Sequence, residues 1–228
     1  MLRKLLDIVG LGAARPSAIK TTASYAPYRL AAANQIYNLL FCDDSGAFKP
    51  KPGETPAPWQ AVLFSEPVAV QSVAALAGDT TAEGRTRALA YNWLRTHGHP
   101  VPSKQLLGVV VEVPLAGGLD VLAAFSDGGV RYINQTGKLA VLEGVPSIKP
   151  TVARLLEASE AVVARIGPWD KPRLPPPSRD RVRLTFLVSD GLYFGEGPMS
   201  VMEREQLAGP VIQQAAQLLQ LIVAAATK

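Results

Sequence analysis

The sequence predicts an α+β fold, in which an antiparallel β-meander plus a second hairpin is packed with amphipathic helices. Four β-type runs separated by glycine turns occupy residues 105–143, and a second pair of runs occupies residues 181–196. Amphipathic stretches precede, separate and follow these two groups. Strands that are grouped between helices are typical of α+β proteins, whereas a regular alternation of strand and helix would indicate a parallel sheet.

The first predicted helix covers residues 29–42. The segment that follows, residues 47–58, contains four prolines and is predicted to be a flexible loop, because proline fixes φ and removes a backbone donor. The helix prediction rests on one stripe at the 3.6-residue period, made of Leu30, Asn34, Tyr37 and Phe41.

Residues 59–97 are predicted to form helices in several pieces, which Pro67 and Gly78 separate. Thr80 and Glu83 have the spacing of a capping box at the start of the last piece. In a capping box each side chain satisfies a backbone N–H at the helix start, so this pair predicts where that helix begins.

The four runs of residues 105–143 are joined by short glycine turns, which force neighbouring strands to be antiparallel. Asp127-Gly128 is a tight-turn signal because such turns need positive φ. The first two runs are apolar on both faces, around Val111 and Ala123. We therefore expect them to be central in the sheet and covered on both sides.

The C-terminal half is predicted to contain a helix, an extended segment, a second hairpin and a last helix. Residues 147–166 keep a helical period, with Ser147 as the expected N-cap. The next segment, 168–180, is rich in proline and is expected to be extended. The second hairpin turns at Asp190-Gly191, and the last helix, about 209–225, carries an apolar stripe with glutamines opposite.

A chain of 228 residues is long enough for one well-filled domain. We expect a single α+β domain over residues 29–228, preceded by residues 1–28 as a basic arm or short amphipathic helix. This arm contains several basic residues and one acid, Asp7, which is a pattern of transit peptides and interfacial helices. Residues 1–12 are therefore the one part for which contact with a membrane surface is expected.

The composition argues against several classes of protein. The net charge is +4, and no more than two basic residues are consecutive, so the dense charge array of a nucleic-acid-binding protein is missing. The single cysteine, Cys42, cannot form an internal disulfide and fits a reducing, cytoplasmic location. No stretch reaches the roughly 18 uninterrupted apolar residues of a membrane span.

Neither a catalytic residue, nor a metal ligand set, nor a cofactor motif is predicted. His97 and His99 lack a third ligand at recognisable spacing and suit a polar helix end. Cys42 stands beside acids at a helix end, which favours the neutral, buried thiol. The glycine-rich turns match no phosphate-binding motif. Two pairs of acids, Asp43 with Asp44 and Glu203 with Glu205, are expected to serve turns and caps.

The remaining candidate is a binding site formed by Trp169, Asp170 and Arg173 of the proline-rich segment, together with Tyr193 on the following hairpin. Tryptophan and arginine are the residues that most often anchor interfaces. The alternative is that this segment is a rigid crossover between a helix and a strand, with Trp169 packed as a plug.

The chain has two histidines and one cysteine. Most nucleophilic and metal-dependent mechanisms therefore lack the side chains that they require. The leading hypothesis is therefore a non-catalytic binding or protein-interaction module, with a protein partner or a homo-oligomer as its assembly. One alternative is an enzyme of unrecognised type with a pocket between sheet and helices. The other is a peripheral membrane-surface protein that is held by residues 1–12.

Overall fold

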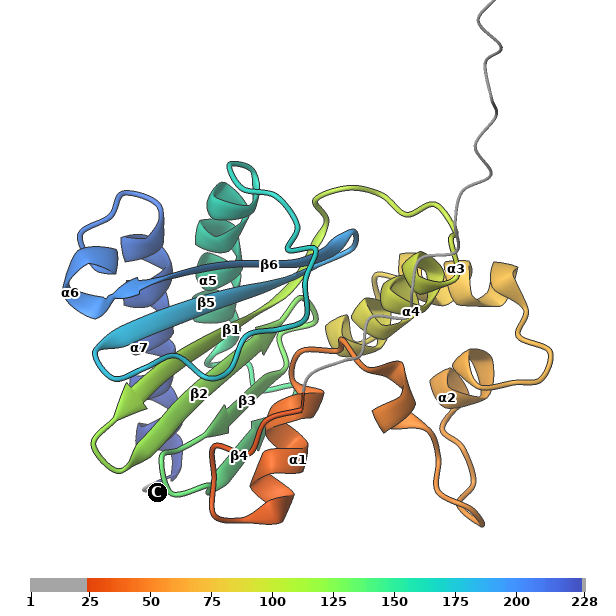
Figure 1. Ribbon diagram of the computed structural model, residues 1–228, viewed down its shortest axis with the longest axis horizontal. Coiled ribbons are helices and arrows are strands. Elements are labelled where there is room, and N and C mark those ends of the chain that lie inside the picture. Colours follow the sequence, from red (N-terminus) through yellow and green to blue (C-terminus); the bar gives the residue numbers. More distant parts are fainter. Residues whose placement is uncertain (1–23, 227–228) are drawn as a thin grey trace, which may run out of the picture.

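The computed structural model describes residues 24–226, which form seven α-helices, one 3₁₀-helix and one six-stranded antiparallel sheet (Figure 1). The helices are α1 (Ala31–Leu39), the 3₁₀-helix η1 (Ser45–Phe48), α2 (Pro58–Leu63), α3 (Val70–Gly78), α4 (Gly84–Thr96), α5 (Lys149–Val163), α6 (Met199–Met202) and α7 (Ala208–Ala226). The strands are β1 (Leu106–Leu115), β2 (Gly118–Phe125), β3 (Val130–Ile133), β4 (Leu139–Leu142), β5 (Arg181–Val188) and β6 (Gly191–Pro198).

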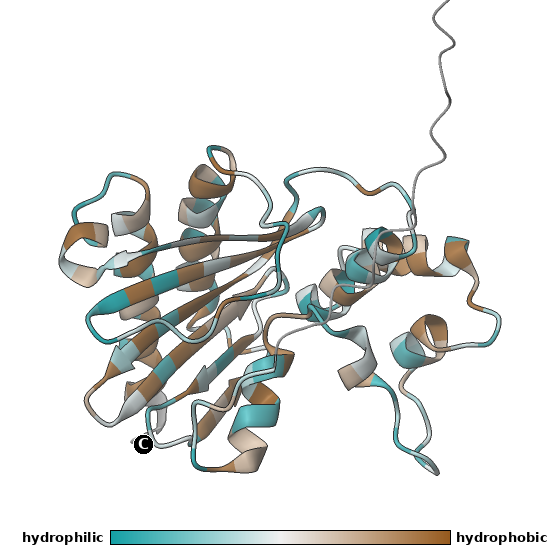
Figure 2. Ribbon diagram, in the orientation of Figure 1, coloured by the Kyte–Doolittle hydropathy of each residue, from teal (hydrophilic) through white to brown (hydrophobic). Residues whose placement is uncertain are grey.

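The strand order is β4-β3-β2-β1-β5-β6, so the meander and the second hairpin join into one sheet along the β1–β5 pair. This arrangement confirms the predicted α+β class. The strands that were expected to be central, β1 and β2, do lie in the interior of the sheet with helices on both faces. Hydrophobic residues run along these strands in Figure 2, as burial on two sides requires.

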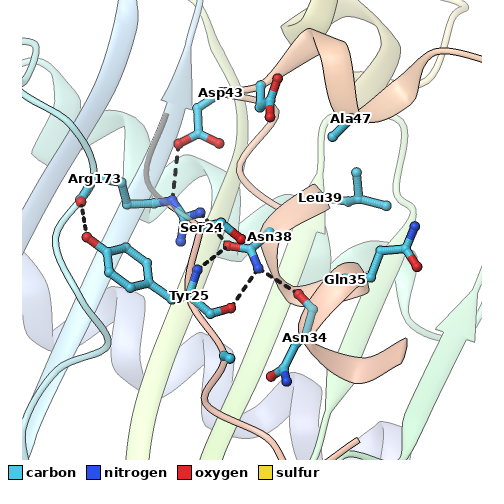
Figure 3. A pocket seen from close by; sticks show the side chains of 11 residues that line it. Ser24, Tyr25, Asn34, Gln35, Asn38, Leu39, Asp43, Ala47 and Arg173 are labelled. Carbon is cyan, nitrogen blue, oxygen red and sulfur yellow. Dashed lines mark hydrogen bonds and ion pairs between the residues drawn. The ribbon is translucent and has the colours of Figure 1, made fainter. Parts of the chain in front are cut away.

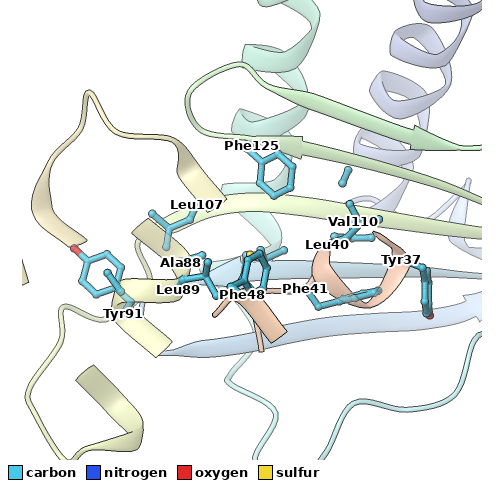
Figure 4. Close-up of a cluster of buried hydrophobic side chains, with 14 of the residues drawn as sticks. Tyr37, Leu40, Phe41, Phe48, Ala88, Leu89, Tyr91, Leu107, Val110 and Phe125 are labelled. Atoms are coloured by element: carbon cyan, nitrogen blue, oxygen red, sulfur yellow. The ribbon is translucent and has the colours of Figure 1, made fainter. Parts of the chain in front are cut away.

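One face of the sheet is covered by α1 and α4, and α2 and α3 lie outside α4 (Figure 1). Figure 4 shows the centre of this cluster, where Phe41 of α1's end and Leu89 of α4 lie close to Val110 of β1. α4 is buried on almost every side because it is enclosed by the sheet and by the outer helices. We call this layer the N-terminal helical layer.

The opposite face is covered by α5 and α7, which pack on each other and on the sheet. The stripe that was predicted for the last helix is the one that α7 buries, and Gln213, Gln217 and Gln220 are exposed. Leu155 of α5 and Leu218 of α7 are completely buried at this face.

Two predicted caps are wrong. α4 begins at Gly84, and neither Thr80 nor Glu83 caps it with a side chain. Its first N–H, that of Gly84, instead donates to Oδ1 of Asp127 in the β2–β3 turn at 2.9 Å. α5 also lacks a side-chain cap, since its N-cap position is Ile148 and not Ser147. The first of these caps comes from a residue far away in the sequence, which local patterns cannot reveal.

The proline-rich segment 168–180 passes the outer edge of β6 and then crosses the face of the sheet that carries α1. The backbone N–H of Trp169 donates to the carbonyl of Leu192 at 2.7 Å, and the indole meets the ring of Phe194 edge-on at 4.9 Å. The carbonyl of Leu174 accepts from Arg183 on β5. The segment therefore has the form of the rigid crossover that was one of the two expectations.

The loop predicted over residues 47–58 is confirmed for residues 49–57, which contain neither helix nor strand, but residues 47–48 belong to η1 and Pro58 begins α2. The expected basic arm lies outside the described residues, except for residues 24–28, which pack against the domain. Tyr28 of this short segment is buried. Among residues 24–226, no helix is both long enough and apolar enough to cross a membrane.

Candidate functional site

α1 holds the extended segment 24–28 through two asparagines that lie one helical turn apart. Asn34 accepts from the backbone N–H of Tyr28 and donates to its carbonyl, both at 2.8 Å. Asn38 accepts from the backbone N–H of Tyr25 at 3.0 Å and donates to its carbonyl at 2.7 Å. Each side-chain amide thus makes the paired hydrogen bonds that a neighbouring strand would make, and these bonds fix the backbone of the segment.

Arg173 comes from the proline-rich segment and inserts its guanidinium beside α1. Nε donates to Oδ2 of Asp43 at 3.1 Å and Nη2 donates to Oδ1 of Asn38 at 2.9 Å. Its planar group lies 3.9 Å from the ring centre of Phe41, and its side chain is 4% exposed. Burial raises the pKa of the Asp43 carboxyl, although the Arg173 charge and hydrogen bond pull it down. A buried cation held this firmly forms a fixed wall.

A cavity of about 370 Å³ opens beside this ion pair (Figure 3). Its wall is built from the segment 24–26, one side of α1, the turn that leads into η1, and Arg173. The volume lies within the range of about 300–1,000 Å³ that is usual for small-molecule sites. The side chains that supply polar groups or rings to the wall are Ser24, Tyr25, Asn34, Gln35, Asn38, Asp43, Asp44 and Arg173.

Under α1, next to this wall, the central strand β1 carries a carboxylate that is completely buried. Oε1 of Glu112 accepts from the hydroxyl of Tyr37 at 2.7 Å, and its Oε2 lies 3.7 Å from Nη1 of Arg183. Burial raises the pKa of Glu112, and burial together with the Glu112 charge also raises that of Tyr37. Tyr37 belongs to the same helix as Asn34 and Asn38, so this contact fixes the helix that forms the cavity wall.

The charges continue along the same face of the sheet towards its edge. Nε of Arg183 donates to Oε2 of Glu196 at 2.8 Å, and Nε of Arg181 donates to Oε1 at 2.6 Å. Burial acts to raise the pKa of Glu196, but the hydrogen bonds and charges of the two arginines outweigh it and leave this pKa below its usual value. The row therefore alternates acid and base across β1, β5 and β6.

The structure separates the residues that were predicted as a binding site. Arg173 lines the cavity, whereas Trp169 packs on β6 and donates from Nε1 to the carbonyl of Pro172. Asp170 is exposed between them. Tyr193 lies on the opposite face of the sheet, where it is 1% exposed and donates to Oδ2 of Asp190 at 3.0 Å. Of the four, only Arg173 contributes to the cavity.

The histidines, the cysteine and the acids that the sequence analysis considered make packing, turn and cap contacts. His97 stacks on Trp93 at the end of α4, with 4.0 Å between ring centres. Within residues 24–226, no three histidine, cysteine or acidic side chains converge as a metal site would need. Cys42 is buried, and burial raises its pKa. Asp44 accepts from the N–H of Gly46, and Glu205 from that of Ala208, which are the expected turn and cap roles.

Sequence reasoning missed the pairing of Asn34 and Asn38 with the backbone of Tyr28 and Tyr25. It also missed the ion pair of Asp43 with Arg173 and the buried Glu112. The available signals were weak but present. Asn34 stands on an otherwise apolar helical stripe, and Glu112 is the one charged residue in the apolar run of β1. A polar group at such a position is retained in a core only when a partner satisfies it, so each of them pointed to a partner from elsewhere.

Comparisons of this chain with protein-family models, with curated proteins and with solved structures give no match. The functional argument therefore rests on the geometry of the cavity and its wall.

Proposed function

We propose that this chain is a non-catalytic binding module and that the cavity beside Arg173 receives a small polar ligand. The observation that supports the proposal is the combination of a cavity of about 370 Å³ with a wall of polar side chains that are already held in place. Asn38 and Arg173 are fixed by the contacts described above. A wall that is ordered before binding loses little conformational entropy when a ligand enters.

The test compares wild type with a variant whose cavity is filled. Gln35 is exposed on α1 and lines the cavity, so Gln35→Trp places a large ring there. Ala32→Trp is the matched control because Ala32 is exposed on the same helix and does not line the cavity. Native mass spectrometry of gently purified full-length protein, followed by ligand-observed NMR with a library of small polar compounds, reports binding.

Wild type and Ala32→Trp are expected to retain or bind the same compounds, and Gln35→Trp is expected to lose them. If all three proteins bind the same compounds, or none binds any, the cavity is not a binding site and the proposal is wrong.

An enzyme is the second candidate, and Asp43 is the observation that favours it. This carboxyl lines the cavity, and its burial raises its pKa, which is the usual condition of a general acid or base. A compound identified by mass spectrometry separates the two functions. A binding module returns the compound unchanged, whereas an enzyme converts it and loses that conversion in Asp43→Asn.

Assembly and location belong to the same proposal. Leu139 and Val141 are half-exposed on the edge strand β4, which suits a protein partner or a second copy. The single cysteine supports a reducing, cytoplasmic compartment. Attachment to a membrane surface through residues 1–12, which lie outside the described residues, predicts binding to anionic vesicles that weakens with salt.

A further inference from the structure

β4 forms one edge of the sheet, and the phase of its hydrogen bonds decides which backbone groups face outwards. The N–H of Asn134 donates to the carbonyl of Lys138 at 2.9 Å, where β3 turns into β4. Hydrogen-bonded residues alternate along an antiparallel pair, so Ala140 is the next residue to bond β3. The N–H and C=O groups of Leu139 and Val141 consequently point away from the sheet.

The side chains on one face of this edge are apolar and exposed. Leu139 and Val141 are 41% and 50% exposed, whereas Ala140 between them packs against the cluster under α5 and α7. Leu30, at the start of α1, is 55% exposed and lies beside the β3–β4 turn, where a Cβ on Gly137 would be 3.5 Å from its Cδ1. Outward backbone groups and exposed apolar side chains therefore occur at the same edge.

The opposite edge of the sheet, β6, is protected in ways that β4 is not. The N–H of Trp169 donates to the carbonyl of Leu192 at 2.7 Å, so the proline-rich segment occupies part of the outer side of β6. β6 also ends at Pro198, which has no N–H. Covering segments and prolines are usual means of keeping a sheet edge from pairing. β4 has only its length of four residues and the adjacent Lys138 for this purpose.

The charges at the two ends of β4 match a reversed copy of the same strand. Lys138 precedes the strand and Glu143 follows it, and both are exposed. Oε1 of Glu143 also accepts from Arg131. When β4 pairs antiparallel with itself, the Lys138 end of each copy lies beside the Glu143 end of the other. Parallel pairing would instead place like charges side by side, which is unfavourable. The charge pattern therefore favours a second copy in antiparallel orientation.

The alternation of side chains restricts the register of such a pair. A twofold axis perpendicular to the sheet keeps the same face of both copies on one side, so odd-numbered residues lie opposite odd-numbered residues. In the register centred on Ala140, Leu139 of each copy lies opposite Val141 of the other. Their outward N–H and C=O groups then bond each other, and the two exposed side chains cover one another.

We infer that β4 pairs antiparallel with β4 of a second copy, centred on Ala140, so that two sheets become one across a twofold axis. This inference rests on the assembly part of the proposed function and names the partner, but it does not depend on the cavity. Stable complexes bury at least about 1,200 Å², and this strand has four residues. We therefore expect a weak dimer with a Kd on the order of 0.1 mM.

Sedimentation equilibrium of the full-length protein, at concentrations on both sides of this Kd, measures the dimer. Leu139→Lys is expected to weaken it at least about tenfold, because a lysine on an edge strand opposes pairing and here adjoins Lys138. Leu115→Lys is the matched control, since Leu115 is 39% exposed but lies at the end of the central strand β1. It is expected to dimerise as wild type does, and thermal unfolding checks that both variants are folded.

A disulfide tests the register. In the pair centred on Ala140, the two copies of this residue form a non-hydrogen-bonded pair with Cα atoms about 4.5 Å apart, which a disulfide can span. Ala140→Cys is therefore expected to give a covalent dimer under mild oxidation, seen on a non-reducing gel. Leu115→Cys is the control and is expected to remain monomeric on the gel, as is wild type, in which Cys42 is buried.

The outcomes separate this inference from the proposed cavity function. A protein that is monomeric at every concentration overturns the inference, as does a dimer that Leu139→Lys leaves unchanged or a disulfide that forms equally in Leu115→Cys. If native mass spectrometry instead shows a protein of another sequence that Leu139→Lys releases, the second copy is wrong and the edge remains a binding surface. Compounds that a monomeric wild type binds and Gln35→Trp loses would leave the cavity function standing without the dimer. A dimer that forms as expected, with no compound lost in Gln35→Trp, would leave only the cavity function wrong.

Discussion

Glu112 and Tyr37 show how single residues hold the N-terminal helical layer on the sheet. Removing a carboxylate from water costs several kcal/mol, and this cost is recovered only when hydrogen bonds and an opposite charge surround the group. Here the Tyr37 hydroxyl donates to Oε1, while Oε2 accepts no hydrogen bond from the described residues and has Arg183 at 3.7 Å, so the cost is recovered only in part. The hydrogen bond ties α1 to β1 at the centre of the sheet.

We predict that Tyr37→Phe lowers the free energy of unfolding by about 1–3 kcal/mol, because a buried carboxylate then loses its hydroxyl donor. Tyr132→Phe is the control, since its hydroxyl donates to Asp120 at the same 2.7 Å but from a half-buried position. Urea unfolding of both variants should show the smaller loss for Tyr132→Phe. Equal losses would mean that burial of Glu112 does not matter.

Glu112 also predicts how stability depends on pH. Its pKa is raised in the folded protein, so the folded state keeps the proton longer than the unfolded state as pH rises above the usual value of 4.5. Stability contributed by the protonated carboxyl is therefore lost as pH rises through the folded-state pKa. Glu112→Gln resembles the protonated form and does not titrate.

The stability of Glu112→Gln relative to wild type should accordingly increase between pH 5 and pH 8, as measured by urea unfolding at both values. Glu196→Gln should show no such change between pH 5 and pH 8 and should gain on wild type only below the usual carboxyl pKa of 4.5, because the pKa of Glu196 is lowered and its contribution is lost as pH falls. A difference between wild type and Glu112→Gln that does not change with pH would contradict the assignment.

At the scale of elements, the start of α4 depends on close backbone approach. A Cβ on Gly84 would lie 2.7 Å from the carbonyl oxygen of Leu107 and 2.8 Å from the N–H nitrogen of Ser126, both of them backbone atoms that cannot move aside. α4 can therefore begin against β1 and the β2–β3 turn only if its first residue lacks a side chain. The Asp127 cap forms at the same place.

We predict that Gly84→Ala destabilises the protein by more than about 1 kcal/mol, although alanine is ordinarily the better helix former. Gly78→Ala at the end of α3 is the control, because a Cβ there meets nothing within 4 Å. Thermal unfolding should show a lower melting temperature for the first variant and an unchanged or higher one for the second. A stabilised Gly84→Ala would show that α4 can shift.

For the whole molecule, one sheet separates two hydrophobic clusters. Leu63 of α2 is buried in the cluster of the N-terminal helical layer, and Leu218 of α7 is buried in the other. Each Leu→Ala change should cost about 2–5 kcal/mol. Because the two sites share no neighbours, the double variant should equal the sum within about 0.5 kcal/mol in urea unfolding. A larger deviation would indicate coupling through the sheet.

The period of the apolar residues and the turn residues predicted most of this architecture, because both depend only on neighbours in the sequence. The turn at Asp127-Gly128 and the last helix follow from neighbours in sequence alone, and the structure has both. The site could not be predicted in the same way. Asp43 and Arg173 are 130 residues apart in the chain, and the partner of a buried polar group is decided by which elements pack together.

The order of layers along the chain has a consequence for synthesis on the ribosome. α1 to α4 precede β1, whereas α5 follows the first four strands and α7 follows the last two. Chains emerge from the amino end at about 5–20 residues per second. For several seconds the apolar faces of Phe41 and Leu89 thus have no strand to cover them. We expect nascent chains that stop before residue 106 to be held by a chaperone, and chains extended through residue 188 to be released.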